Sequence, residues 1–143
     1  AEEISSSYGG TGFKWSTDAD ERTRLWQARH DILWATKAMR PGFELYTGDI
    51  CVPISRLAES IVAATEDIEA SHLFGQVIGH VGDGNFHTAY LLDPERPGDV
   101  AEAERLADRL VERALAVGGT ASGEHGIGMG KLKFMRQEHG AAV

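Results

Sequence analysis

The sequence has a single cysteine, no long apolar run and no signal segment. With only Cys51 present, an internal disulfide is excluded, and its place in an apolar run predicts a buried thiol. No stretch of 18 apolar residues occurs, and the first residues do not form a charged and then apolar leader. These absences predict neither a membrane span nor an export signal, and we expect a reducing, cytoplasmic location.

Basic residues are also in deficit. Lys and Arg number 14 against 22 Asp and Glu, which gives a formal net charge of −8. Nucleic acids and anionic lipids bind clustered Lys and Arg, and no such cluster is present, so neither is expected as a partner. With 143 residues and 42% hydrophobic content, the chain can form one packed domain.

Both ends of the sequence look cut. Residues 1–12 are polar and glycine-rich and do not begin with Met, and residues 138–143 trail away after a lysine-containing apolar segment. We therefore expect residues 1–143 to be one domain of a longer protein, incomplete at both ends.

Three stretches have the apolar spacing of helices. A long helix is predicted from Asp18 to Met39, with one buried face made by Leu25, Ala28, Ile32, Ala35 and Met39. A second follows Pro53, which suits a first helical turn, and a third follows residues 97–99, with Asp99 as its expected N-cap. The third has an inner face of Ala103, Leu106, Leu110, Val111, Ala114 and Val117, and Gly118 and Gly119 end it.

Three further stretches are typical of strands. Residues 44–52 are extended, and the β-rich stretches 76–81 and 86–92 flank Gly82-Asp83-Gly84-Asn85, which predicts a hairpin with a four-residue loop. The order of these elements predicts an α+β fold in which helices cover one face of an antiparallel sheet, in a ferredoxin-like arrangement.

Two histidines flank this hairpin loop, in the motif His80-Val-Gly-Asp-Gly-Asn-Phe-His87. With a loop of residues 82–85, His80 would lie opposite His87 on the same sheet face. Directly opposed Cβ atoms are about 4.5–5.5 Å apart, so two imidazoles can converge on one metal ion. Spacing alone equally allows two histidines stacked beside a turn.

A second motif is glycine-rich: Ala121-Ser-Gly-Glu-His-Gly-Ile-Gly-Met-Gly-Lys131. Its glycines let the backbone adopt unusual dihedrals and approach a ligand closely. Glu124 would complete a set of two histidines and one carboxylate, and His125 can serve as an acid or base near neutrality. The alternatives are a loop that only turns the chain or one that cradles phosphate, although the spacing of nucleotide-binding loops is absent.

Together with Trp26-Gln-Ala-Arg-His30 and Asp49-Ile-Cys-Val-Pro-Ile-Ser-Arg-Leu57, these motifs resemble the C-terminal domain of the FAD-linked oxidase family. That family contains D-lactate, glycolate and D-2-hydroxyglutarate dehydrogenases. The resemblance runs from about Gly10 to Lys133 and is strongest to the D-lactate dehydrogenase (cytochrome) and glycolate oxidase branch. Ala89 and Thr47 stand where the hydroxyglutarate branch has Asn and Lys, so a long dicarboxylic substrate is disfavoured.

The resemblance implies a flavin-dependent oxidation of a D-2-hydroxy acid to a 2-oxo acid, with hydride transfer to FAD. It implies that His80, His87 and Glu124 hold a divalent metal, zinc or manganese, and that His125 takes the hydroxyl proton. Arg29 would fix the substrate carboxylate. Without the resemblance, Arg29 would pass for an ordinary solvated helix arginine.

The same resemblance implies that the FAD-binding domain and the family's closing segment lie outside this sequence. Electrons would pass from FAD to a protein or quinone acceptor, and the parent protein could lie at a membrane surface. We expect no redox turnover from the isolated chain. Two rival hypotheses are a free-standing metal-dependent hydrolase or lyase that uses the same residues, and a non-catalytic remnant that self-associates through an exposed apolar surface.

Overall fold

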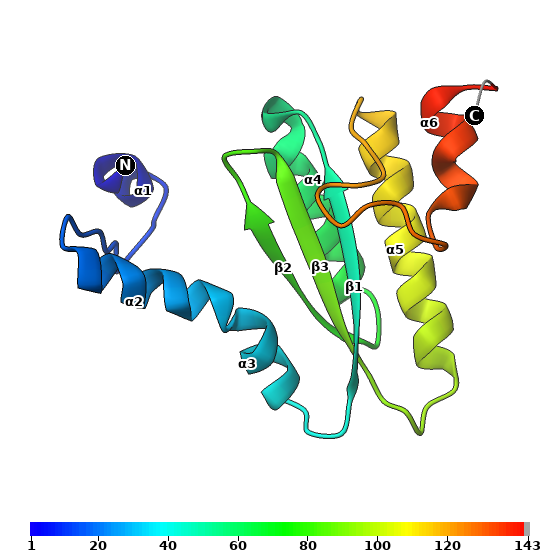
Figure 1. The fold of residues 1–143 in the computed structure, drawn as a ribbon, viewed down its shortest axis with the longest axis horizontal. Helices are drawn as coiled ribbons and strands as arrows, with labels where there is room; N and C mark the ends of the chain where they lie inside the picture. The colour runs from blue at the N-terminus through cyan, green and yellow to red at the C-terminus, as the bar shows by residue number, and fades with distance from the viewer. Residues whose placement is uncertain (142–143) are drawn as a thin grey trace. The chain divides into compact units, whose positions relative to one another are not determined.

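The computed structural model describes residues 1–141, which divide into two compact units (Figure 1). The first unit spans Ala1–Ala38 and the second begins at Met39. Within the described residues, the second unit contains a three-stranded antiparallel sheet with helices packed against it. The predicted α+β class is therefore confirmed.

The first unit is helical, with α1 (Glu2–Ser7), α2 (Ala19–His30) and α3 (Ile32–Ala38). The prediction of one long helix with a buried face is wrong. The helix is interrupted at Asp31, and none of the five residues of the expected face is buried. The physical reason is that α2 carries few apolar residues among many charged ones, so their helical spacing does not bury them. The exposed side chains include Trp15, Trp26 and Trp34.

The sheet of the second unit is formed by β1 (Glu44–Cys51), β2 (Phe74–His80) and β3 (Asn85–Leu92), in the order β1-β3-β2. Helices α4 (Ile54–Glu69) and α5 (Gly98–Ala116) contact the sheet and each other. Their apolar side chains pack against alternate residues of β3, Phe86 and Tyr90 among them. Period-two alternation sends Asn85 and His87 to the opposite face.

Sequence patterns explain both long helices. The predicted inner face of α5 is buried except for Val117, which follows the helix and is partly exposed. The helix ends at Ala116, and Gly118, with a φ of 80°, turns the chain after it. In α4, Leu57, Ala64 and Ile68 form the buried face. Pro53 is the N-cap residue of α4, one position before the first turn in which we expected it.

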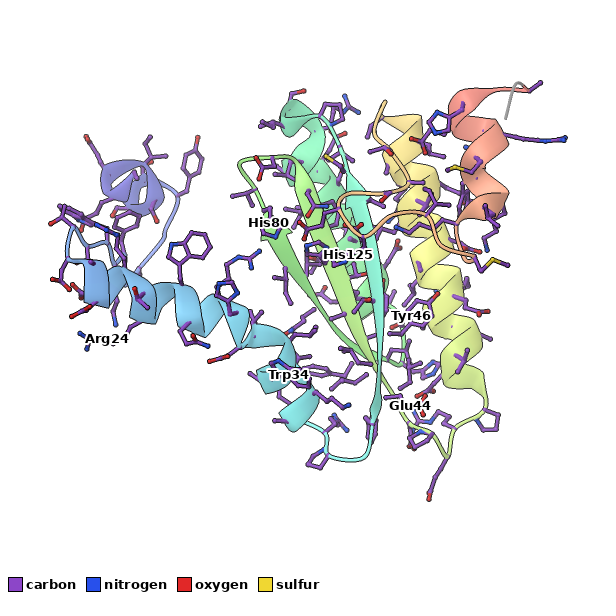
Figure 2. The ribbon with its side chains drawn as sticks, in the orientation of Figure 1. Arg24, Trp34, Glu44, Tyr46, His80 and His125 are labelled. Atoms are coloured by element: carbon purple, nitrogen blue, oxygen red, sulfur yellow. The ribbon has the colours of Figure 1, made fainter. Side chains whose placement is uncertain are left out.

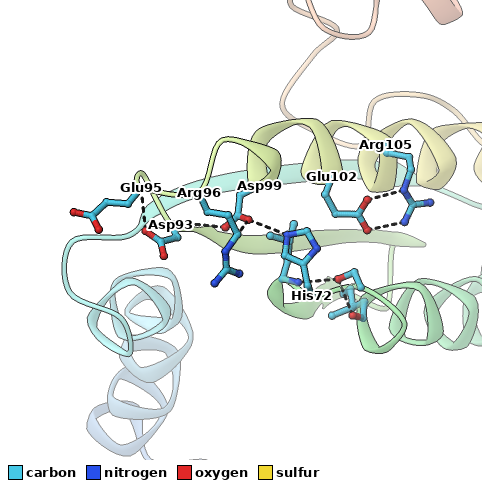
Figure 3. A network of polar contacts seen from close by, with 10 residues as sticks. His72, Asp93, Glu95, Arg96, Asp99, Glu102 and Arg105 are labelled. Carbon is cyan, nitrogen blue, oxygen red and sulfur yellow. Dashed lines mark hydrogen bonds and ion pairs between the residues drawn. The ribbon is translucent and has the colours of Figure 1, made fainter.

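Asp99 lies in the first turn of α5 but does not cap that helix, so the N-cap prediction is wrong. Pro97 holds the N-cap position, while the Asp99 carboxylate points back to the preceding segments (Figure 3). Its Oδ2 accepts a hydrogen bond of 2.9 Å from the backbone N–H of Asp93, and its Oδ1 lies 2.8 Å from Nε2 of His72. Asp99 therefore ties the start of α5 to the turn before β2.

The hairpin between β2 and β3 has a different register from the predicted one. His80 pairs with Asn85, and His87 pairs with Ile78, so the four-residue loop is 81–84. The backbone N–H of Asp83 donates to the carbonyl of His80. Gly84 has a φ of 76°, which glycine adopts readily and residues with a side chain rarely adopt. The shift in pairing is two residues, and therefore His80 and His87 still share one sheet face.

After the glycine-rich loop come the short helices η1 (Leu132–Phe134) and α6 (Met135–His139). Phe134 is buried in the core formed by the sheet, α4 and α5. Among residues 1–141, no helix has both the length and the hydropathy needed to cross a membrane.

Candidate metal and substrate site

The two hairpin histidines meet on the sheet face opposite α4 and α5. His80 ends β2 and His87 lies near the start of β3 as its diagonal neighbour. Their ring centroids are 5.5 Å apart and the rings are nearly perpendicular. The hairpin therefore brings the two imidazoles together, although not through the direct pairing that we predicted.

The glycine-rich loop is fixed to this end of the sheet at several points. Thr120 forms an antiparallel bridge with Cys51 at the end of β1, and the next residue, Ala121, donates its backbone N–H to Glu138 of α6. Further along, Nζ of Lys131 donates to the backbone carbonyl of Asp49. His80 and His125 consequently appear at the same end of the sheet in Figure 2.

Glu124 completes the predicted ligand set. Its Oε1 lies 3.4 Å from Nε2 of His80 and 3.2 Å from Nε2 of His87, and the three ligand atoms lie within 4.8 Å of one another. Bonds of about 2.0–2.1 Å at tetrahedral angles place two ligand atoms about 3.3–3.4 Å apart. The donor set and its spacing therefore fit a divalent ion bound through two imidazoles and one carboxylate.

Asp49 lies between His87 and the backbone of the glycine-rich loop and is only 4% exposed. Its Oδ2 accepts hydrogen bonds of 3.0 Å from the backbone N–H groups of Gly123, Glu124 and His125, and its Oδ1 accepts one of 2.8 Å from the Asn85 amide. Burial by itself raises the pKa of Asp49, but these hydrogen bonds and the charge of Lys131 outweigh it and lower the pKa below its ordinary value. Asp49 is therefore ionised at neutral pH.

His87 is the most enclosed of the site histidines, with a side chain 15% exposed. Burial lowers its pKa and outweighs the opposite effects of Asp49 and Glu124, while His125 and His80 lower it further. The ring is therefore neutral near pH 7, the form that ligates metals. Its Nδ1 is buried without an aligned hydrogen-bond partner among the described residues, although Oδ1 of Asp49 is 3.2 Å away.

His125 follows Glu124 on the loop and projects outward. Its side chain is 67% exposed, its Nε2 lies 3.8 Å from Oε1 of Glu124, and its ring centroid is 5.2 Å from that of His87. An incoming molecule can therefore reach His125 while it contacts the ligand set. Asp49, His87 and His125 form a second possible metal group that shares His87.

The predicted site residues thus fall into two groups. His80, His87, Glu124 and His125 lie together in the second unit, whereas Arg29 is a partly buried residue of α2 in the first unit. The role of Arg29 in holding a substrate carboxylate stays a prediction.

Sequence reasoning missed Asp49 and Asn85 as parts of this site. The available signal was a carboxylate directly before the apolar run Ile50-Cys51-Val52 of a predicted strand, because such a group needs polar partners if it is buried. The expectation for the glycine-rich loop is confirmed at Gly126 and Gly128, whose φ angles are 76° and 52°. Cys51, expected to be buried, is partly exposed, and its thiol contacts the carbonyl of Asp83.

Comparison with known proteins agrees with these motifs. The family model described as "FAD linked oxidases, C-terminal domain" matches residues 1–143. A probable mitochondrial D-lactate dehydrogenase of Danio rerio is 48% identical over 97% of this chain and 28% of its own length. A mitochondrial D-lactate dehydrogenase (cytochrome) of Arabidopsis thaliana is 42% identical over 97% of this chain and 24% of its own.

A bacterial relative, the glycolate oxidase subunit GlcD of Escherichia coli K12, is 33% identical over 89% of this chain and 25% of its own length. The chain therefore spans about a quarter of the length of these relatives. Two of the three are named as mitochondrial, which does not fit the expectation of a cytoplasmic location. The match over its whole length shows that this chain belongs to the FAD-linked oxidase family, as its C-terminal domain.

Proposed function

We propose that this chain supplies the metal and substrate site of a flavin-dependent D-2-hydroxy-acid dehydrogenase of the D-lactate or glycolate type. The observation that carries the proposal is the convergence of His80, His87 and Glu124 beside the exposed His125. The names of the relatives support the substrate class, since they describe D-lactate dehydrogenases and a glycolate oxidase subunit. Within this proposal, FAD is bound mainly by another part of the protein.

Oxidation of the C2 alcohol requires removal of a hydride from carbon and a proton from oxygen. When bound, a zinc or manganese ion would acidify the hydroxyl and orient the carboxylate, while FAD would accept the hydride. His125 is proposed to take the hydroxyl proton, a role supported by its exposed imidazole beside the proposed ligands. Loss of the hydride from C2 and of the proton from its hydroxyl leaves a C=O bond at C2, and the product is a 2-oxo acid.

The other chain residues would bind and orient the substrate. Glu124 would give the site a hard oxygen ligand, while His80 and His87 would give nitrogen ligands. Arg29 is proposed to pair with the substrate carboxylate, for which its planar guanidinium is suited. A separate protein or quinone would receive the electrons from the flavin. Self-association of the isolated chain is also a proposal.

The test is anaerobic reduction of the flavin in the full-length protein. D-lactate or glycolate should bleach the flavin absorbance, whereas L-lactate should not, and His125→Gln should slow the bleaching while metal stays bound. Metal-dependent hydrolysis or elimination by a protein that never reduces its flavin would contradict the proposal. That result would favour the rival hydrolase or lyase.

A further inference from the structure

We infer that Asp49 is the positioning residue of this site: it fixes the loop that carries Glu124 and His125, and it orients the ring of His87. The inference rests on the proposed function for the identity of the site. It concerns a residue that contacts neither the substrate nor the ion.

The first argument concerns the loop. Three consecutive backbone N–H groups, those of Gly123, Glu124 and His125, converge on one oxygen of Asp49. Hydrogen bonds to an ionised acceptor are stronger than neutral ones, and this acceptor is buried. Because the proposed ligand and the proposed base are adjacent in the chain, one carboxylate oxygen sets the backbone position of both.

The second argument concerns the ring of His87. Asp49 and His87 are direct partners across β1 and β3, so their side chains leave the sheet side by side. Nδ1 of His87 lies 3.2 Å from Oδ1 of Asp49, a distance at which a small rotation of the ring would align a hydrogen bond, and Nε2 lies 3.2 Å from Oε1 of Glu124. A proton on Nδ1 leaves the lone pair of Nε2 free for an ion, and a carboxylate on Nδ1 is the usual orienting partner of a metal-bound histidine.

Asp49 is poorly suited to be a ligand itself, although it belongs to a possible metal group with His87 and His125. Its Oδ2 already accepts three N–H groups, and its Oδ1 accepts the Asn85 amide, which also donates to the carbonyl of Ile50. These donors occupy the lone pairs that an ion would need. The geometry therefore favours an orienting role for Asp49 over direct coordination.

The test compares Asp49→Asn with the wild type in the full-length, metal-free protein. An asparagine has one acceptor oxygen, so either the loop N–H groups or the Asn85 amide would face an NH₂ group. We expect faster hydrogen exchange at the amides of residues 123–125. On titration with Zn²⁺ and separately with Mn²⁺, we expect an affinity about 10–100-fold lower, the usual effect of removing a partner of a metal-bound histidine.

Asp83→Asn is the matched control, because Asp83 is exposed in the nearby hairpin loop and its loss changes the charge equally. It should leave both the exchange and the affinity as in the wild type. Equal metal affinity in Asp49→Asn and the wild type would overturn the inference, as would an equal loss in the control. If the wild type bound neither ion, the metal proposal would fail, while the exchange data would still decide whether Asp49 holds the loop.

A measurement on the wild type guards against misfolding of the variant. The ¹⁵N chemical shifts of the imidazole nitrogens report which one carries the proton. The inference predicts that His87 is protonated on Nδ1 both without metal and with Zn²⁺ bound. A proton on Nε2, or a metal bound through Nδ1, would overturn it.

Discussion

Gly123 lies where the glycine-rich loop presses against two buried side chains, and Gly123→Ala is therefore a sharp test of the site geometry. A Cβ at this position would stand 1.6 Å from Nδ2 of Asn85 and 2.4 Å from Oδ1 of Asp49. Neither side chain has room to retreat, since both are buried and hydrogen-bonded. The loop itself must therefore move away from Asp49.

The cost follows from the hydrogen bonds that the movement breaks. Each bond to an ionised acceptor contributes about 1.5–3 kcal/mol, and three such bonds hold the loop to Asp49. Losing even one means that ion binding must supply that energy to reform the loop. Since about 1.4 kcal/mol corresponds to a tenfold change, Zn²⁺ affinity should fall about 10- to 150-fold.

The assay is calorimetric titration of Zn²⁺ into the metal-free protein. Gly130→Ala is the control, because it makes the same change in the same loop and no atom lies within 4 Å of the added Cβ. The control should bind Zn²⁺ as the wild type does. If Gly123→Ala retained full affinity, the close approach of the loop to Asp49 would not be needed for the site, and the reasoning would be refuted.

Three further predictions follow from other parts of the molecule. His125→Gln should keep the metal, measured by elemental analysis, but reduce substrate oxidation by about 100-fold or more, as removal of a general base does; loss of metal would refute a purely proton-transferring role. Asp99→Asn should destabilise the protein by about 1–3 kcal/mol in urea at neutral pH. Burial raises the pKa of Asp99, but the Asp93 N–H, His72 and Arg96 outweigh it and lower the pKa. The ionised carboxylate therefore stabilises the fold above the ordinary carboxyl range, and this stabilisation is lost as pH falls below about 4. The free energy of unfolding of the variant should consequently change less with acid than that of the wild type. Leu106→Ala, in the core, should cost about 2–5 kcal/mol on thermal or urea unfolding, whereas Leu132→Ala, at an exposed position, should cost little; equal effects would contradict the burial described.

Local patterns predicted the second unit well because its helices and strands have complete apolar faces. The inner face of α5 and the hairpin both followed from spacing. The hairpin register was predicted incorrectly because Asn85, which looks like a turn residue, is drawn into β3 by its buried bonds to Asp49 and Ile50. The histidines kept their common face only because the shift was even.

The parts that sequence could not reveal depend on contacts between distant residues. Asp49 accepts a hydrogen bond from the backbone N–H of Gly123, which lies 74 positions away in the sequence, and no local pattern predicts that contact. The prediction over residues 18–39 was right about helical structure but wrong about a single helix with a buried face. Its apolar residues sit at helical intervals, but none of the five expected to be buried is buried within the described structure.

The central claim is that His80, His87 and Glu124 bind one divalent ion, and elemental analysis of the purified full-length protein tests it most directly. We predict about one zinc or manganese ion per chain in the wild type, and loss of that ion in His80→Ala and in Glu124→Ala. His30→Ala, which removes an exposed histidine of the other unit, should keep it. A metal-free wild type after supplementation with both ions, or a full complement of metal in His80→Ala, would contradict the account.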